Sequence, residues 1–254
     1  ELNNSLYFFQ RQLRWTVLGI GALVVGTFFP LDVIRHLSKW ILGLTGALLL
    51  ATHIPGIGIT ELGSSRWIHI GPLSVQPSEV AKLALAIYLA DMLARLGPRS
   101  WNLNQFRQAI LPVIGVLGLV LVQPDLGTTI VLGIAAYVLF FCNGTRMSVM
   151  VAVAAAGIAG VLYHSFSTPY QRARWTGFMD PWADPQGLGY QLVQSLMAIE
   201  SGGLFGEGWG QSKQKLFYLP IQYADFIFAV LAEELGLVGT LALLMLFLIL
   251  AWRG

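Results

Sequence analysis

The longest apolar segment of the sequence follows a polar loop, and the two meet within residues 211–236, QSKQKLFYLPIQYADFIFAVLAEELG. Two lysines, Lys213 and Lys215, lie in the polar part, which runs to Pro220. Asp225 then stands at the start of the apolar part. An ionisable residue at the mouth of a membrane segment marks a candidate functional site. The stretch therefore predicts a membrane-spanning helix that begins beside an acid.

The composition of the whole chain is typical of an integral membrane protein. The chain has 254 residues, of which 56% are hydrophobic and 11% are charged, and its mean hydropathy is +0.67. Its net charge of +2 does not indicate a nucleic-acid partner. The single cysteine, Cys142, cannot form an internal disulfide and ends an apolar run, so we interpret it as a packing residue.

Seven apolar stretches are predicted to span the membrane as helices, because lipid offers no hydrogen-bonding partners to free backbone groups. They are residues 13–34, 38–54, 78–95, 106–122, 126–142, 147–164 and 225–252. The connections between them carry turn residues, as in Gly97-Pro98. The predicted fold class is all-α, a polytopic bundle of membrane helices that forms a single transmembrane domain over residues 1–254.

Basic residues predict the orientation of the spans, because Lys and Arg concentrate in short cytoplasmic loops. If the first span enters from outside, seven basic residues fall on the cytoplasmic side and three outside, with the long segment 165–224 left out. The seven are Arg35, Lys39, Arg95, Arg99, Arg107, Arg146 and Arg253, and the three are Arg11, Arg14 and Arg66. Both long connections, residues 55–77 and 165–224, then lie on the outer face, where we expect the chemistry.

The large outer loop, residues 165–224, is predicted to be ordered, because it carries enough aromatic surface to pack on the bundle or to lie at the membrane interface. Its aromatic residues include Trp175, Phe178, Trp182, Tyr190, Trp209, Phe217 and Tyr218. Residues 190–199 are apolar but too short to span the membrane, so we predict a re-entrant or interfacial helix there. Loops of this length inside a domain are usually functional.

Glu79 and Lys82 are three residues apart and therefore share one face of the predicted helix 78–95. Two interpretations stay open. The two side chains form an internal ion pair that lets both charges enter the membrane, or Lys82 faces a cavity and holds an anionic head group. Arg66 and Trp67 also have two interpretations, because this pair is an ordinary anchor at a membrane surface.

Three further motifs are interpreted as structural. Asp125 follows a proline and is predicted to cap the next helix. Asp180 and Asp184 are each expected to cap a turn, since two carboxylates without a third ligand are weak evidence for a divalent cation. The glycine-rich residues 206–210 lack the strand and the spacing of a nucleotide-binding loop, so we predict a flexible turn.

Asp225 begins an apolar helix, where partial loss of hydration suits a carboxylate to act as a general base. The alternative is that it caps the helix, a contact that stabilises by about 1 kcal/mol. Glu233 lies eight residues further on, about 12 Å deeper at the rise of a helix, and is followed by Glu234. Both glutamates need buried partners or lie at the far interface, so we interpret them as structural polar contacts.

Together these motifs resemble the SEDS family, whose members are FtsW, RodA and their relatives. The resemblance is carried by Arg66-Trp67, Gln76-Pro77-Ser78-Glu79 with Lys82, residues 123–128, Asp180-Pro181-Trp182 with Asp184-Pro185, Gly189-Tyr190-Gln191 and residues 225–236. Residues 191–196 and 214–220 are more similar to FtsW than to RodA. The family has roughly ten spans. The seven here would be the second to the eighth, and we interpret the chain as part of a longer protein.

The resemblance implies a peptidoglycan glycosyltransferase that polymerises lipid II, a disaccharide peptide linked to undecaprenyl pyrophosphate, at the outer face of the cytoplasmic membrane. It also implies a class B penicillin-binding protein and other divisome proteins as partners, a place at the division septum, and no role for nucleic acid. The family's essential loop aspartate falls on Asp225, its tryptophan on Trp67 and its lysine on Lys82.

Under this hypothesis Asp225 takes a proton from the 4-hydroxyl of the acceptor sugar, which then displaces the pyrophosphate of the donor with inversion. Lys82 and Arg66 stabilise the leaving pyrophosphate, with or without a divalent cation such as Mg²⁺ or Mn²⁺. The expected substrate-binding residues are Lys82, Arg66, Trp67, Glu79 and Gln76.

Two other functions stay open. A lipid II flippase would depend on deep charges such as Glu233 and Glu234 more than on Asp225, because it needs alternating access. A scaffold for a penicillin-binding protein is the third possibility, because Tyr223 and Ala224 stand where the family has polar residues beside its aspartate.

Overall fold

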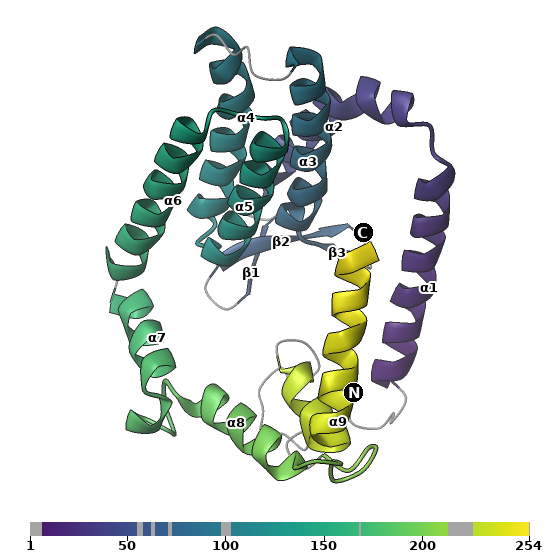
Figure 1. Ribbon diagram of the computed structural model, residues 1–254, viewed down its shortest axis with the longest axis vertical. Coiled ribbons are helices and arrows are strands. Elements are labelled where there is room, and N and C mark those ends of the chain that lie inside the picture. The colour runs from purple at the N-terminus through teal and green to yellow at the C-terminus, as the bar shows by residue number, and fades with distance from the viewer. Residues whose placement is uncertain are drawn as a thin grey trace. The chain divides into compact units, whose positions relative to one another are not determined.

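The computed structural model describes residues 7–54, 58–61, 64–70, 73–97, 103–167, 169–212 and 226–253. The elements along the chain (Figure 1) are α1 (Tyr7–Phe28), α2 (Leu31–Ala51), β1 (Gly58–Glu61), β2 (Ser64–Ile70), β3 (Leu73–Val75), α3 (Pro77–Leu96), α4 (Leu103–Val122), α5 (Leu126–Cys142), α6 (Met147–Ser167), α7 (Pro169–Met179), the 3-10 turn η1 (Pro181–Ala183), α8 (Tyr190–Gly202) and α9 (Ile227–Arg253). The chain divides into two compact units, Glu1–Val161 and Leu162–Gly254.

Helices occupy all seven stretches that the sequence predicts to span the membrane, so the all-α prediction is confirmed. Among the described residues, α2, α4, α6 and α9 have both the length and the hydropathy of a membrane span, and α5 is apolar but shorter. The predicted boundary of the first span is wrong, because α1 ends at Phe28 and α2 begins at Leu31. Pro30 has no N–H with which to continue a helix, and its carbonyl accepts the first hydrogen bonds of α2.

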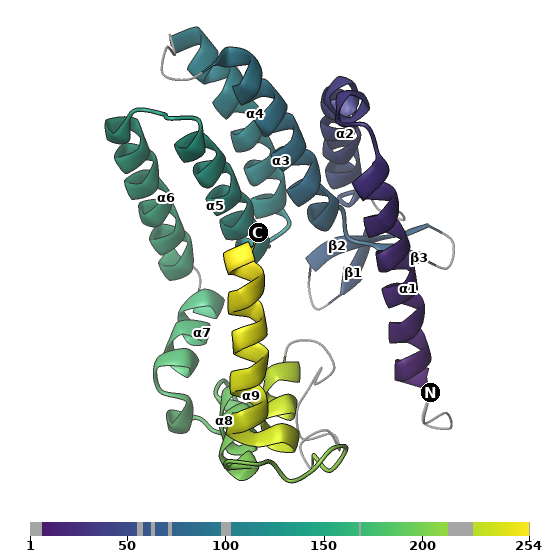
Figure 2. The same ribbon diagram turned by 45° about the vertical axis from the view of Figure 1, so that its right-hand side comes forward.

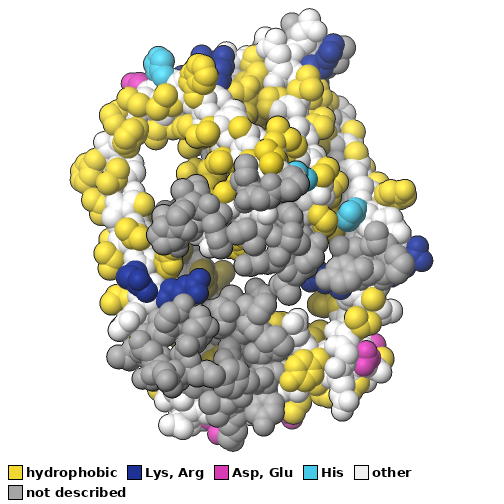
Figure 3. Space-filling view, turned by 180° about the vertical axis from the view of Figure 1, so that it is seen from behind, with side chains coloured by type: hydrophobic (Ala, Val, Ile, Leu, Met, Phe, Trp, Pro, Cys, Tyr) yellow, Lys and Arg dark blue, Asp and Glu magenta, His cyan; other side chains and the backbone are white. Residues whose placement is uncertain are grey.

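The core of the first unit lies between α2, α3, α4 and α5. Each of these helices contributes at least one fully buried side chain to the same cluster, among them Leu49, Leu89, Val120 and Leu132. The outward faces of the helices are largely apolar, as the yellow side chains of Figure 3 show. Apolar side chains on the outside of a bundle suit lipid as the surrounding solvent.

A small antiparallel sheet, which the sequence analysis does not predict, lies beside the ends of α2 and α3 (Figures 1 and 2). Its strand order is β1-β2-β3, and Ile68 of β2 pairs with Gly58 of β1 and with Val75 of β3. The strands fall within the predicted outer connection 55–77. They are three to seven residues long, and strands this short leave little alternation of apolar and polar residues from which to predict them.

In the second unit, α8 confirms the short helix predicted at residues 190–199, and α7 is a helix that the sequence analysis does not predict. Aromatic side chains hold the start of this unit together. Trp175 of α7 stacks on Phe166, with ring centroids 6.3 Å apart, and meets Phe178 edge to face at 6.4 Å. Such pairs stabilise beyond the area that they bury. These contacts order the start of the predicted outer loop, and the part of the prediction that concerns Phe217 and Tyr218 lies outside the described residues.

Helix α9 is kinked at Gly236, whose backbone angles are φ 64° and ψ −164°. The loop that follows α8 supplies hydrogen-bonding partners at the kink. Leu237 N–H donates to the carbonyl of Gly203, and Glu207 N–H donates to the carbonyl of Glu233. A kinked membrane helix is tolerated where neighbouring backbone satisfies the groups that the kink frees. The glycine-rich residues 206–210 are predicted from the sequence to form a flexible turn. Glu207 and Gly208 of this stretch are instead hydrogen-bonded to the backbone of α9.

Candidate functional site

The guanidinium of Arg66 joins the sheet to the turn between α4 and α5. Its Nε donates to the carbonyl oxygen of Gln123 at 3.1 Å, and its Nη2 donates to the carbonyl oxygen of Pro124. Two charged hydrogen bonds to the backbone fix both the position and the angle of the side chain. Arg66 is therefore a structural link, and the surface-anchor interpretation does not account for its contacts.

Trp67 follows Arg66 in β2 and pairs with Ile59 of β1. Side chains alternate between the two faces of a strand. Trp67 therefore projects to the face opposite the buried Ile68. Arg66 is the unpaired residue at which the register of β1 and β2 shifts. The indole is partly buried. It therefore offers an aromatic surface on the face of the sheet opposite Ile68.

Gln123 is a buried polar residue at this end of the first unit, and the sequence analysis includes it in the motif 123–128 without predicting its contacts. Its side chain is 2% exposed, and its Nε2 donates to Thr52 Oγ1 at 2.9 Å and to the carbonyl of Leu49 at 3.2 Å. Among the described residues its Oε1 has no hydrogen-bonding partner. Gln123 thus ties the end of α2 to the α4–α5 turn that Arg66 also holds. A glutamine beside a proline in an apolar chain is the only sequence signal for it.

Gln76, Glu79 and Lys82 lie at the start of α3, which contacts β2. Gln76 is the residue before the helix, and its amide Nε2 donates to Ser78 Oγ at 3.0 Å. Lys82 Nζ lies 2.7 Å from Glu79 Oε2, so the internal ion pair is present. Both side chains are partly exposed, at 37% and 55%. The lysine therefore also keeps part of its surface open, and its predicted contact with a head group stays a prediction.

Asp125 caps α5 as predicted. Its carboxylate accepts hydrogen bonds from the backbone N–H of Thr128 at 3.1 Å and from the hydroxyl of Thr128 at 2.8 Å. The side chain is buried, and both carboxylate oxygens are occupied. We therefore assign Asp125 a capping role.

The predicted base, Asp225, lies outside the described residues, as do Tyr223 and Ala224. Helix α9 begins at Ile227, and Phe226 accepts the first hydrogen bonds of the helix from Ala229 and Val230. The helix thus starts within two residues of the predicted start of the span. The role of Asp225 as base or cap stays a prediction.

Glu233 is buried in the second unit with a partner, as the sequence analysis expects of it. Its side chain is 1% exposed, and its Oε2 accepts a hydrogen bond from the hydroxyl of Ser212. The backbone carbonyl of Glu234 accepts a hydrogen bond from Gly208 N–H. Sequence reasoning did not identify Ser212 as the partner, because it lies in a polar loop with no periodic pattern.

Asp184 caps a turn as predicted, since its two oxygens accept hydrogen bonds from the N–H groups of Gly187 and Leu188, each at 3.0 Å. Asp180 precedes the 3-10 turn η1 but forms no side-chain hydrogen bond that caps it, so the prediction that Asp180 caps a turn is wrong. Within the described ranges, no three His, Cys, Asp or Glu side chains come close enough together to hold a metal ion.

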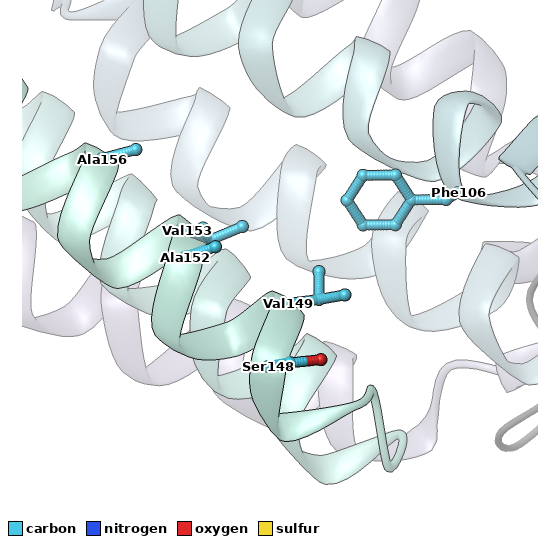
Figure 4. Close-up of a pocket in the computed structure, with 6 residues that line it drawn as sticks. All are labelled: Phe106, Ser148, Val149, Ala152, Val153 and Ala156. Atoms are coloured by element: carbon cyan, nitrogen blue, oxygen red, sulfur yellow. The ribbon is translucent and has the colours of Figure 1, made fainter.

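Among the described residues of the first unit, two cavities bear on the search for a site. One, of about 400 Å³, is almost entirely apolar, and Figure 4 shows Val149 and Val153 of α6 facing Phe106 of α4 across it. The other, of about 560 Å³, lies between α2, α3 and α4 and carries charged side chains, among them Asp91 and Arg95. Neither cavity is lined by a predicted site residue.

The sequence of this chain matches a known protein family along its whole length. The model of the family described as cell cycle protein, FtsW/RodA/SpoVE, matches residues 1–254. Stage V sporulation protein E of Bacillus subtilis is 40% identical over all of this chain and 70% of its own length. Probable peptidoglycan glycosyltransferase FtsW of Thioalkalivibrio sulfidiphilus is 41% identical over all of this chain and 64% of its own length. The chain therefore spans about two thirds of these relatives.

A solved structure shares the fold. It belongs to work on the structural coordination of polymerization and crosslinking by a peptidoglycan synthase complex. The match has a TM-score of 0.71 and 28% identity, and it covers 94% of this chain and 66% of the other. The helical bundle described above is thus an arrangement already seen in that complex.

Proposed function

Because this chain belongs to the family of cell cycle proteins that contains FtsW, RodA and SpoVE, we propose that it forms part of a peptidoglycan glycosyltransferase of the cytoplasmic membrane. The observation that supports this most is the match along all of residues 1–254, with 41% identity to a relative named for that activity. The chain is a multi-pass membrane protein, and we propose that it polymerises lipid II at the outer face of the membrane during septal division.

The proposed reaction is a single displacement. Asp225 removes the proton of the acceptor 4-hydroxyl, and the freed oxygen forms a bond to the anomeric carbon of the donor. The bond between that carbon and the pyrophosphate oxygen breaks, and undecaprenyl pyrophosphate leaves with the electron pair. Lys82, which is partly exposed beside Glu79, stabilises the charge on the leaving group.

Arg66 has a supporting role in this proposal. Its guanidinium is engaged by the carbonyls of Gln123 and Pro124, so it holds β2 at the point where the register shifts, directly before Trp67. Trp67 and Gln76 then offer an aromatic surface and an amide to the sugars of the substrate. The proposed protein partner is a class B penicillin-binding protein with other divisome proteins, an assembly supported by the peptidoglycan synthase complex whose fold this chain shares.

The test is polymerisation of purified lipid II by the full-length protein together with its class B penicillin-binding partner. We expect Asp225→Asn to abolish the glycan product, because the amide cannot accept the proton. The matched control is Asp32→Asn, a change of the same kind at a carboxylate that is 87% exposed at the start of α2. It should polymerise lipid II at the wild-type rate.

Other outcomes separate the alternatives. Transport of labelled lipid II across vesicles by a protein that makes no polymer would favour a flippase. A wild-type protein that makes no polymer but raises the activity of its partner would favour a scaffold. If Asp225→Asn polymerised lipid II at the wild-type rate, Asp225 would not be the general base.

A further inference from the structure

The charged cavity between α2, α3 and α4 lies away from every predicted site residue. Four of its α3 residues, Tyr88, Asp91, Met92 and Arg95, follow the spacing of one helical face. Lys39 of α2 and Gln108 of α4 face them across the cavity, which holds about 560 Å³. The cavity is therefore walled by three helices of one unit and combines polar and apolar side chains.

The single acid in this cavity is already neutralised. Asp91 accepts hydrogen bonds from Arg35 Nε at 3.3 Å, from Arg95 Nε at 3.0 Å and from Ser38 Oγ at 3.1 Å. The Asp91 side chain is 4% exposed, whereas Arg95 is 54% exposed. Two guanidinium groups on one carboxylate leave one positive charge in excess, and the outer face of Arg95 remains open.

Lys39 adds a second positive charge. It lines the cavity, and it has no ion pair with any residue that the structure describes. The exposed Asp32 approaches Arg35 at 3.9 Å and offsets part of the charge at the surface. Arg35, Arg95 and Lys39 together outnumber Asp91 and Asp32, so the cavity keeps a net positive charge and favours an anion.

The other walls indicate that this anion belongs to a lipid. Met92, Leu111 and Pro112 supply apolar surface, and Leu111 is 59% exposed on a helix with the character of a membrane span. Pro112 also has no N–H, so the carbonyl of Gln108, four residues earlier, lacks its usual helical donor. That carbonyl, the Tyr88 hydroxyl and the Gln108 amide can bond to a polar head group.

The position along the helices agrees with this assignment. Arg95 lies in the last turn of α3, at the end remote from the sheet (Figure 1). Basic clusters mark the cytoplasmic end of membrane helices. Basic pockets between helices on that side bind the head groups of anionic lipids.

We propose that the cavity between α2, α3 and α4 binds the phosphate head group of an anionic phospholipid in the cytoplasmic leaflet, with Lys39 and Arg95 contacting the phosphate. This site differs in location from the proposed lipid II site, because none of its residues belongs to that site. It does not depend on the proposed catalytic function.

The test is a titration of the purified full-length protein in detergent micelles with dioleoyl phosphatidylglycerol, read as bound lipid by native mass spectrometry. Dioleoyl phosphatidylcholine is the zwitterionic comparison, and inorganic phosphate is added as a competitor. Removal of one basic residue near an anionic lipid weakens binding about fivefold. We therefore expect Lys39→Gln to lower phosphatidylglycerol binding about fivefold and Lys39→Arg to restore it.

The matched control is Arg146→Gln, which removes one exposed positive charge at the start of α6 and outside the cavity. It should bind phosphatidylglycerol as the wild type does. Equal losses in Lys39→Gln and Arg146→Gln would mean general surface attraction and would overturn the proposal. Equal binding of the two lipids, no lipid binding, or full displacement by millimolar inorganic phosphate would overturn it too. The thermal unfolding midpoint of Lys39→Gln checks that its fold is intact, since Lys39 makes none of the Asp91 contacts.

Discussion

Ser212 donates a hydrogen bond from its hydroxyl to the carboxylate of Glu233, which lies twenty-one residues later in the chain and is 1% exposed. The bond joins the loop that follows α8 to the part of α9 just before its kink at Gly236. Both side chains are buried. Removal of the Glu233 carboxylate would therefore leave the Ser212 hydroxyl buried without this acceptor and would create a cavity.

The first prediction follows from that bond. Glu233→Ala should lower the free energy of unfolding by about 1–3 kcal/mol, the cost of leaving a buried polar group unsatisfied. Glu233→Gln keeps an acceptor oxygen and should cost less. The measurement is the thermal unfolding midpoint in detergent, with Glu200→Ala at an exposed position of α8 as the control. Equal midpoints for Glu233→Ala and the control would contradict the structural role.

Gly236 should not tolerate a side chain. Its φ of 64° lies in the left-handed region, and a Cβ there would overlap the backbone nitrogen of Gly206. We expect Gly236→Ala to destabilise the protein by about 1–3 kcal/mol. Gly43→Ala is the control, because its Cβ would meet no atom within 4 Å. A lower yield of folded protein in membranes for Gly236→Ala alone is the expected readout, and unchanged yield would argue against the junction described here.

Lys82 should matter for activity more than for stability. The Lys82–Glu79 pair is partly exposed, and such pairs contribute about 0.2–1 kcal/mol. Under the proposed function, Lys82→Gln should reduce lipid II polymerisation about 100-fold, as the loss of one group that stabilises developing charge does. Lys82→Arg should recover part of the rate, and Arg146→Gln at the other end of the helices serves as the control. If Lys82→Gln instead lowers the unfolding midpoint and leaves the rate unchanged, the ion pair is its only role.

Arg66 should matter for stability first. Replacement by alanine removes a charged donor from the carbonyls of Gln123 and Pro124, at a cost of about 1–3 kcal/mol. Arg66→Lys should be intermediate, because an ammonium group cannot reproduce the fork of a guanidinium. The unfolding midpoint is compared with that of Arg14→Ala, whose side chain bonds to a carbonyl of its own helix. A full loss of polymerisation with an unchanged midpoint would assign Arg66 to the substrate instead.

Much of the candidate site could be read from local sequence. The pairing of Glu79 with Lys82 follows from their spacing on a helix, and Asp125 caps α5 because it follows a proline at the start of an apolar run. The contacts of Arg66 could not be predicted in this way. Its acceptors are backbone carbonyls fifty-seven and fifty-eight residues away, and no periodic pattern links positions so far apart.

The sequence by itself determined the membrane helices, the short helix of the outer loop and the family, because hydropathy, helix caps and ordered motifs are properties of contiguous residues. Tertiary structure alone decided which polar groups meet. It placed Gln123 against Thr52, Ser212 against Glu233, and Arg35 with Arg95 on Asp91. A buried polar group must find its partner in three dimensions, and that partner depends on how the helices pack.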